Sequence, residues 1–205
     1  MAKAFALAAG AATVVLLGGS YAATTLLADG RDCAPGSVMG GDIGGPFELV
    51  TSAGETVTQD DVITGPTLIY FGYTYCPDVC PFDVARNAAA VEFLEEDGEL
   101  VTPVFISVDA RRDTLDVVGD YAANFHPRMI GLTGSPEQIR AAADAYRVRF
   151  TGENGAGEDY LMGHTSFSYL MTPDYGFVDF FSSEVGPEDM AHDISCLLDQ
   201  AERSA

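Results

Sequence analysis

Residues 67–81 of the chain read TLIYFGYTYCPDVCP. The first five are apolar and rich in β-forming side chains, and a short run of this kind is typical of a buried strand. Cys76 and Cys80 follow directly, and apolar residues from about Asp78 to Glu96 recur at roughly helical spacing. The stretch therefore predicts a buried strand, a junction that carries two thiols, and a helix.

Two thiols at such a junction can act on the same atom. On a helix, residues i and i+4 share one face, with Cβ atoms about 5–6 Å apart, so both sulfurs can point at one ion or at each other. A helix N-terminus also lowers the pKa of a thiol, because its free N–H groups and dipole favour the thiolate. The spacing C-x-x-x-C is one residue longer than a thioredoxin-type redox motif. By itself it leaves open a metal site, a redox pair and an inert structural pair.

The remaining pattern predicts alternating strands and helices. A hairpin is expected at 47–50 and 55–57, around a Ser-Ala-Gly turn. Further strands are expected at 100–108, 129–132, 147–151, 166–171 and 177–181, and further helices at 114–125, 135–146 and 187–200. Alternating units imply a parallel core, to which the last two strands add an antiparallel hairpin at one side. The predicted fold class is α/β, a thioredoxin-like mixed sheet with flanking helices.

The N-terminus predicts a membrane segment. Residues 4–28 carry no charge, and this run exceeds the ~20 residues that span a bilayer. A lysine precedes the run and acidic residues follow it, which places the rest of the chain outside the cytoplasm. We expect an N-terminal transmembrane helix at 1–28, a flexible tether at 29–45 and one folded domain at 46–205. A cleaved signal peptide, with its cleavage site near residues 20–22, is the alternative.

The charge balance restricts the partners. The chain has 31 acidic and 10 basic side chains, a net charge of −21. Phosphates would repel this composition, so nucleic acid is excluded as a partner, whereas cationic partners are allowed. The N-terminus lacks an Arg- and Ser-rich transit segment, which favours a bacterial protein over an organellar one. We expect a single-pass protein of the bacterial inner membrane with its domain in the periplasm.

Two further cysteines, Cys33 and Cys196, remain. Pairing is compatible with an oxidising compartment, and a disulfide between them would close a very long loop, worth on the order of 4–5 kcal/mol. Two unrelated buried thiols are the alternative, because sequence does not give connectivity.

Three histidines compete to be a third ligand beside the two thiols. His126 precedes a proline at a helix end, where it is expected to cap the helix or face solvent, and His192 lies among acidic residues on the last helix. His164 follows Gly163, between a Gly- and acid-rich loop and the strand that begins near Ser166. That position makes His164 the best candidate, with an ordinary loop histidine as the alternative.

The donor types favour copper. Structural zinc usually takes four ligands, whereas two thiolates and one imidazole suit Cu(I), or Cu(II) with an added oxygen ligand. An open three-ligand site can also accept a ligand from a partner and release its ion by exchange.

The segment FGYTYCPDVCP (71–81) resembles the signature of the SCO/SenC copper proteins, the assembly factors for the copper centre of cytochrome oxidase subunit II. Similar segments follow in order: GGPFELV (44–50), FISVD (105–109), RDT (112–114), GLTGSPEQI (131–139), AYRVRF (145–150) and YLMTPDYGFV (169–178). The resemblance implies a thioredoxin-like fold, with copper bound by Cys76, Cys80 and His164. It also implies a metallochaperone that takes copper from a donor protein and delivers it to the binuclear centre of cytochrome c oxidase subunit II.

Two positions depart from the family pattern. Gly163 stands where the family commonly has Asp before the histidine, and Ala110 stands where it usually has Pro. Neither change removes a ligand, but the first removes a carboxylate that would orient the imidazole or meet a partner.

Other functions remain open at this point. The alternative is a thiol–disulfide oxidoreductase, in which Cys76 attacks and Cys80 resolves, reducing the cysteines of an exported partner; it would not require His164. A copper sensor or peroxidase-like protein has only the shared fold in its favour.

Overall fold

The computed structural model describes residues 42–152 and 160–204. The predicted anchor at 1–28, Cys33 and most of the predicted tether lie outside these ranges. Within them, no helix combines the length and the apolar character that crossing a membrane requires. The described end of the tether is attached to the domain, since the Gly44 N–H donates to the carbonyl of Ala145 at 2.9 Å.

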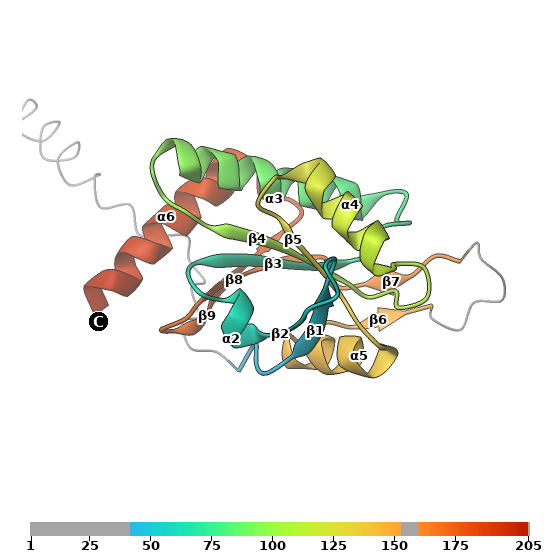
Figure 1. Cartoon of the computed structure of the whole chain (residues 1–205). Helices are drawn as coiled ribbons and strands as arrows, with labels where there is room; N and C mark the ends of the chain where they lie inside the picture. The colour runs from blue at the N-terminus through green and yellow to red at the C-terminus, as the bar shows by residue number, and fades with distance from the viewer. Residues whose placement is uncertain (1–41, 153–159, 205) are drawn as a thin grey trace, which may run out of the picture. The chain divides into compact units, whose positions relative to one another are not determined.

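A seven-stranded mixed sheet forms the centre of the domain, in the order β2-β1-β5-β4-β3-β8-β9 (Figure 1). Its strands are β1 (Glu48–Thr51), β2 (Thr56–Thr58), β3 (Thr67–Gly72), β4 (Thr102–Ser107), β5 (Ile130–Thr133), β8 (Phe167–Thr172) and β9 (Gly176–Ser182). β3, β4 and β5 run parallel, and β8 pairs antiparallel with both β3 and β9. The predicted parallel core with an antiparallel hairpin at one side is therefore confirmed.

Helices cover both faces of this sheet. They are α2 (Gln59–Val62), α3 (Val79–Glu96), α4 (Leu115–Phe125), α5 (Pro136–Ala145) and α6 (Pro187–Ser204). Figure 1 shows α3 and α4 on one face and α5 on the other, and α6 packs against α3. The single turn of α2 was not predicted.

The fifth helix shows how local sequence sets its ends. Ser135 and Gln138 form a capping box, in which each side chain accepts a hydrogen bond from the other residue's N–H. After the helix, Arg147 adopts a φ of 58°, and the Val148 N–H reaches back to the carbonyl of Ala143 at 2.8 Å. The predicted strand at 147–151 is wrong in its first half for this reason, and only β6 (Phe150–Thr151) is strand.

The central strand is buried over its whole length. All six residues of β3 are inaccessible, as expected for a strand with neighbours on both sides and helices on both faces. Phe71 packs against Tyr146, with ring centroids 5.3 Å apart, and edge-on against Tyr169, at 6.3 Å. This packing fixes the end of β3, from which the cysteine segment departs.

The cysteines fall into two groups. Cys196 is disulfide-bonded, whereas Cys76 and Cys80 are free thiols. The expected partner of Cys196, Cys33, lies outside the described residues. Both thiols of the C-x-x-x-C motif are therefore available for chemistry.

Candidate metal centre

Three predicted side chains meet at one end of the sheet. The ligand atoms of Cys76, Cys80 and His164 all lie within 4.8 Å of one another. Sγ of Cys80 lies 3.0 Å from Nε2 of His164, across 84 positions of the chain. The fold thus brings together the three residues that the sequence singled out.

The cysteine segment is a turn followed by a helix N-terminus. The Cys76 N–H donates to the carbonyl of Tyr73 at 3.2 Å, and α3 begins at Val79 after Asp78. Cys76 therefore precedes the helix, and the expectation that both thiols share a helix face by i, i+4 spacing is wrong. The turn brings them together instead, and the Cys80 N–H donates to Sγ of Cys76 at 3.4 Å.

A buried carboxylate from the loop between β4 and α4 holds this turn. Asp113 accepts from the N–H of Thr74 at 3.0 Å and from its hydroxyl at 2.6 Å. The same carboxylate accepts from the hydroxyl of Ser107, at the end of β4, at 2.5 Å. No role for Asp113 was predicted, although it lies in the stretch 112–114 that resembles the family. Its three contacts link the turn before Cys76 to the sheet.

His164 lies on a short strand of its own. β7 (Gly163–His164) pairs antiparallel with β6, with His164 opposite Phe150. Nδ1 of His164 lies 3.1 Å from the carbonyl of Thr165. Because a carbonyl oxygen can only accept, Nδ1 carries the proton and Nε2 presents its lone pair to the thiols. Such a hydrogen bond fixes the tautomer that a metal ligand needs.

Two tyrosine rings pack edge-on against this imidazole. The centroids of Tyr70 and Tyr73 lie 6.1 and 5.9 Å from that of His164. Burial lowers the pKa of His164, so the ring is neutral at neutral pH. A neutral imidazole is the form that binds a metal ion.

The two thiols differ in acidity. Burial opposes ionisation of Cys76, but hydrogen bonds from the Cys80 side chain and from the N–H groups of Cys80 and Asp78 outweigh it and lower its pKa. Burial, followed by the hydrogen bond to Cys76, raises the pKa of Cys80. The hydrogen bond from the Cys80 side chain, aided by N–H groups at the start of α3, therefore makes Cys76 the more acidic thiol. The lower pKa predicted for a thiol at a helix N-terminus does not hold for Cys80.

A buried polar network lies behind the cluster. The Tyr70 hydroxyl donates to Oδ2 of Asp83 at 3.0 Å, and Arg86 pairs with Oδ1 of the same carboxylate at 3.2 Å. The guanidinium of Arg86 also donates to the carbonyl of Ser182 at 2.6 Å and to the hydroxyl of Ser168 at 2.9 Å. This network ties α3 to β8 and β9, the elements that flank the site. An apolar helix pattern did not indicate it.

The other two histidines lie elsewhere. His126 is buried, and its Nδ1 accepts from the N–H of Arg128 at 3.1 Å, while Nε2 lies 3.4 Å from Glu95. The expectation that it caps the helix is confirmed, since His126 is the C-cap residue of α4 and its N–H donates to the carbonyl of Ala122 at 3.2 Å. The alternative that it faces solvent is wrong, because its ring is buried against the loop that follows α4. His192 is exposed on α6, as expected.

The donor set fits a soft metal ion. An ion held about 2.0–2.3 Å from each donor needs neighbouring donors roughly 4 Å apart. The three atoms meet this requirement with little movement, since the Cys80–His164 hydrogen bond only has to lengthen. Two sulfurs and one imidazole nitrogen are a ligand set of the kind that Cu(I) prefers.

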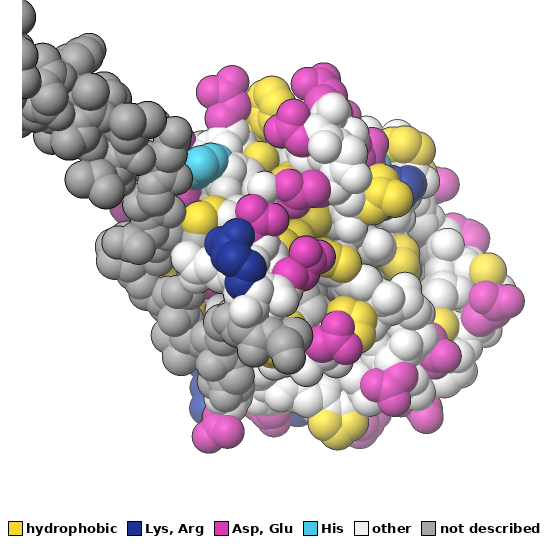
Figure 2. All heavy atoms as spheres, turned by 90° about the vertical axis from the view of Figure 1, so that its left-hand side faces the viewer, with side chains coloured by type: hydrophobic (Ala, Val, Ile, Leu, Met, Phe, Trp, Pro, Cys, Tyr) yellow, Lys and Arg dark blue, Asp and Glu magenta, His cyan; other side chains and the backbone are white. Residues whose placement is uncertain are grey.

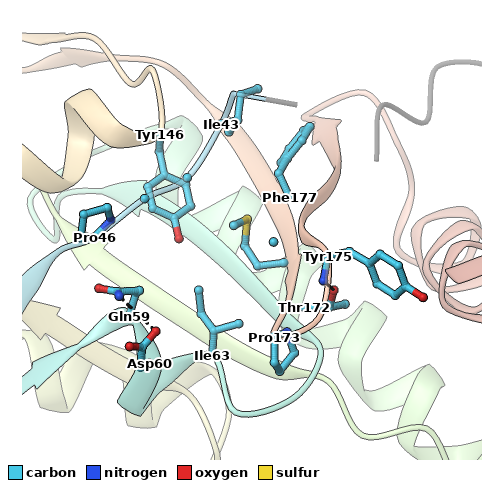
Figure 3. Close-up of a pocket in the computed structure, with 14 residues that line it drawn as sticks. Ile43, Pro46, Gln59, Asp60, Ile63, Tyr146, Thr172, Pro173, Tyr175 and Phe177 are labelled. Atoms are coloured by element: carbon cyan, nitrogen blue, oxygen red, sulfur yellow. Dashed lines mark hydrogen bonds between the residues drawn. The ribbon is translucent and has the colours of Figure 1, made fainter. Parts of the chain in front are cut away.

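The opposite end of the sheet is built differently. A hollow of about 550 Å³ lies beside the start of β3 and is lined by Ile63, Tyr146, Met171 and Phe177, among others (Figure 3). Met171 pairs with Thr67, whereas the cysteines follow Gly72 at the far end of the strand. The described residues that line this hollow include neither cysteine nor histidine. Metal chemistry is therefore assigned to the other end.

Comparisons with known proteins agree with this geometry. The sequence profile of the SCO1/SenC family matches residues 37–199. The protein SenC of Rhodobacter capsulatus is 50% identical over 202 residues, covering 96% of this chain and 91% of its own. The solved structure of Arabidopsis thaliana ScoI with copper bound is 42% identical, with a TM-score of 0.72, covering 77% of this chain and 99% of that one. The solved structure of Bradyrhizobium japonicum ScoI with copper bound is 40% identical, with a TM-score of 0.66, and the match covers 75% of this chain and 98% of that one.

Proposed function

The chain belongs to the SCO1/SenC family, and we propose that it is a copper metallochaperone that delivers copper to the binuclear copper centre of cytochrome c oxidase subunit II. The observation that carries this proposal is the convergence of Cys76, Cys80 and His164 within 4.8 Å. The copper-bound relatives described above support it, since both share more than a third of their sequence with this chain.

The residues divide the work of holding the ion. Cys76 supplies a thiolate readily, because its pKa is lowered, whereas Cys80 gives up its proton as the ion binds, since binding favours the deprotonated ligand. His164 offers Nε2 without losing a proton, because its own N–H is engaged with Thr165. Three ligands leave the ion open to a fourth, so an acceptor can begin to bind it before the chaperone lets go.

The setting follows from the N-terminal sequence. Residues 1–28 anchor the chain in the bacterial inner membrane as a single pass, and the domain works in the periplasm. A donor protein loads the domain with copper there. The anchor keeps the loaded domain close to the membrane in which the oxidase is assembled.

The test measures copper per protein on the reduced whole chain, beside His164→Ala. We expect one tightly held copper in the unchanged protein and at least a tenfold weaker affinity in the variant. Zinc, measured in parallel, should bind more weakly, since the described cluster has three donors rather than four. Copper affinity that is unchanged in His164→Ala would exclude the three-ligand site.

A second candidate function is thiol–disulfide exchange. The acidic, half-buried Cys76 and the buried, less acidic Cys80 have the asymmetry of an attacking and a resolving thiol. The Cys76 thiolate attacks a partner disulfide and forms a mixed disulfide, and Cys80 then displaces the partner as a dithiol. The partner gains two electrons, and Cys76 and Cys80 become a disulfide that an external thiol reductant must restore.

The two functions separate in one variant. His164→Ala should keep thiol exchange with a small aromatic disulfide within about threefold of the unchanged protein, while losing copper affinity. Loss of exchange together with copper binding would tie both activities to the histidine. Failure of the unchanged protein to retain copper, with rapid exchange intact, would favour the reductase.

A further inference from the structure

Large exposed apolar side chains gather beside the three ligands. Six such side chains are at least a third exposed among the described residues: Tyr75, Phe82, Phe93, Leu100, Leu161 and Phe180. Tyr75, Phe82 and Leu161 each lie within three residues of Cys76, Cys80 and His164, respectively, and are 58%, 74% and 69% exposed. We call these three the apolar rim. Every ligand of the cluster thus has one member of the rim within three positions along the chain.

The rim stands on well-supported backbone. The guanidinium of Arg112 lies 4.9 Å from the ring centroid of Tyr75 and 3.6 Å from that of Tyr160, the neighbour of Leu161. Arg112 also donates to the carbonyl of Tyr160 at 2.9 Å, and the Tyr160 hydroxyl donates to Asp109 at 2.5 Å. Tyr75 and Leu161 are therefore exposed even though hydrogen bonds and ring contacts hold the residues around them in place.

Phe82 belongs to a different element, the helix α3. It lies in the first turn of α3, two residues after Cys80, and one helical turn rises only about 5.4 Å. Asp83, the next residue, faces the buried network with Tyr70, so Phe82 points away from the core. Phe82 on α3 and the pair Tyr75 and Leu161, which flank Arg112, thus present exposed apolar side chains from three segments that also carry the ligands.

The area of the rim fits a brief contact between proteins. A large aromatic side chain can bury about 150–250 Å², and Tyr75 and Phe82 are 58% and 74% exposed, so together with Leu161 the rim offers roughly 350 Å². Transient complexes bury less than about 1,200 Å² in total, or roughly 600 Å² on each partner. The rim alone would supply most of one side of such a contact.

We propose that the apolar rim is the docking surface for the protein that receives copper, an inference that rests on the proposed copper-carrier function. An acceptor atom must come within about 2.0–2.3 Å of the ion while the three ligands still hold it. The acceptor must therefore cover the residues around the cluster. The partner that fits this surface is a protein whose soft copper ligands are exposed within an apolar patch.

Charge argues for an apolar contact in particular. Acidic side chains are scattered over the opposite end of the domain (Figure 2), and the whole chain carries −21. The rim itself is uncharged, and among the described residues the exposed charges beside it, Asp78 and Arg111, are of opposite sign. Salt screens interactions between exposed charges beyond about 10 Å at 0.1 M. Because the rim is uncharged, docking through it should depend little on salt.

The test follows copper from the loaded whole chain to the reduced, copper-free copper domain of cytochrome c oxidase subunit II. The variant Phe82→Ser/Leu161→Ser removes two members of the rim. The matched control, Phe93→Ser/Leu100→Ser, changes the same residue types where α3 ends and β4 begins, and Leu100 is 68% exposed. A small soluble Cu(I) chelator serves as a second acceptor that needs no docking surface.

We expect the rim variant to hold one copper and to release it to the chelator at the normal rate. Its transfer to the protein acceptor should slow at least tenfold, and the control should stay within twofold. Raising NaCl from 0.05 to 0.5 M should change the rate for the unchanged protein by less than threefold.

Each other outcome has a definite meaning. A normal transfer rate in the rim variant, with copper retained, overturns the docking surface and leaves the carrier function standing. Equal slowing toward the chelator, or in the control variant, also overturns it, since the change then acts on the metal site or on the whole domain. If the unchanged protein fails to hold copper, the carrier function fails first, and the docking proposal falls with it.

Discussion

Gly72 packs so closely against Cys80 that the glycine has no room for a side chain. A Cβ at this position would lie 3.3 Å from Sγ of Cys80, 2.9 Å from the ring of Tyr70 and 3.1 Å from the ring of Phe105. All three neighbours are fully buried, so none can move away freely. The absence of one methyl group at the end of β3 therefore sets where the buried sulfur lies.

Gly72→Ala should damage stability and metal binding together. Overpacking of a filled core costs about 1–3 kcal/mol, and the clash displaces Cys80 from His164. Urea unfolding measures the first effect and competition with a Cu(I) chelator the second. Gly65→Ala is the control, because a Cβ there meets nothing within 4 Å. A Gly72→Ala protein with normal copper affinity would show that the position of the sulfur is set elsewhere.

The link between Asp113 and Thr74 can be tested with a pair of hydroxyl variants. Thr74→Val removes the 2.6 Å hydrogen bond to the buried carboxylate, whereas Thr74→Ser keeps it. A hydrogen bond to a charged group is worth about 1.5–3 kcal/mol, so Thr74→Val should be destabilised by that amount and Thr74→Ser should stay near the unchanged protein. Outer contacts of a metal site typically change affinity about 10–100-fold, and copper binding should fall at least tenfold in Thr74→Val alone. Similar copper affinity in the two variants would contradict a role for this link.

The opposite pKa shifts of the two thiols predict unequal alkylation. The thiolate is the reactive form, and the lowered pKa of Cys76 keeps it populated at a pH where an ordinary thiol is protonated. With iodoacetamide, Cys80→Ser, which leaves Cys76, should react at least tenfold faster at pH 7 than Cys76→Ser, which leaves the buried Cys80. As the pH falls, the rate in Cys80→Ser should decline only below the ordinary thiol range. Mass spectrometry of the labelled peptides checks both the rate and the site.

Loss of the Cys80–Cys76 hydrogen bond modifies this experiment. Contacts from Cys80 help to lower the pKa of Cys76, so the serine at position 80 has to supply a similar donor. Cys80→Ala serves as the comparison, and Cys76 should be less acidic there than in Cys80→Ser. Equal rates for Cys76 and Cys80 at every pH would show that burial does not distinguish the thiols.

The order of most strands and helices was predictable because their signals lie in neighbouring residues of the sequence. The buried run in β3, the capping box at Ser135 and the Pro-Asp-Tyr-Gly turn at 173–176 depend only on neighbouring residues. The strand at 147–151 failed because Arg147 takes a positive φ, which a non-glycine residue does not signal. β6 and β7 pair over only two residues each, which is too short to leave a periodic pattern in the sequence.

The three ligand residues of the site were predictable, but the residues that hold them in place were not. The chain has only four cysteines and three histidines, and Cys76 and Cys80 lie in a distinctive segment. The chemistry of these two residues and of His164 could therefore be inferred from composition and resemblance. No role was predicted for Asp113 or Asp83, because nothing local shows that a carboxylate is buried against a distant hydroxyl. Likewise, the space that Gly72 leaves for Cys80 exists only once strand and helix are packed.

The two described histidines with hydrogen-bonded rings should have opposite effects when removed. His126 is 3% exposed and accepts from the N–H of Arg128, so His126→Ala leaves that donor unpaired and should cost about 1–3 kcal/mol of stability. It lies at the end of α4, outside the metal cluster, and copper affinity should stay within twofold. His164→Ala should show the reverse, with a small change in the urea midpoint and a large loss of copper affinity. Both variants replace a histidine by alanine, so a fall in copper affinity in both would point to global unfolding. A fall in copper affinity in His126→Ala alone would show that His164 is not the third ligand.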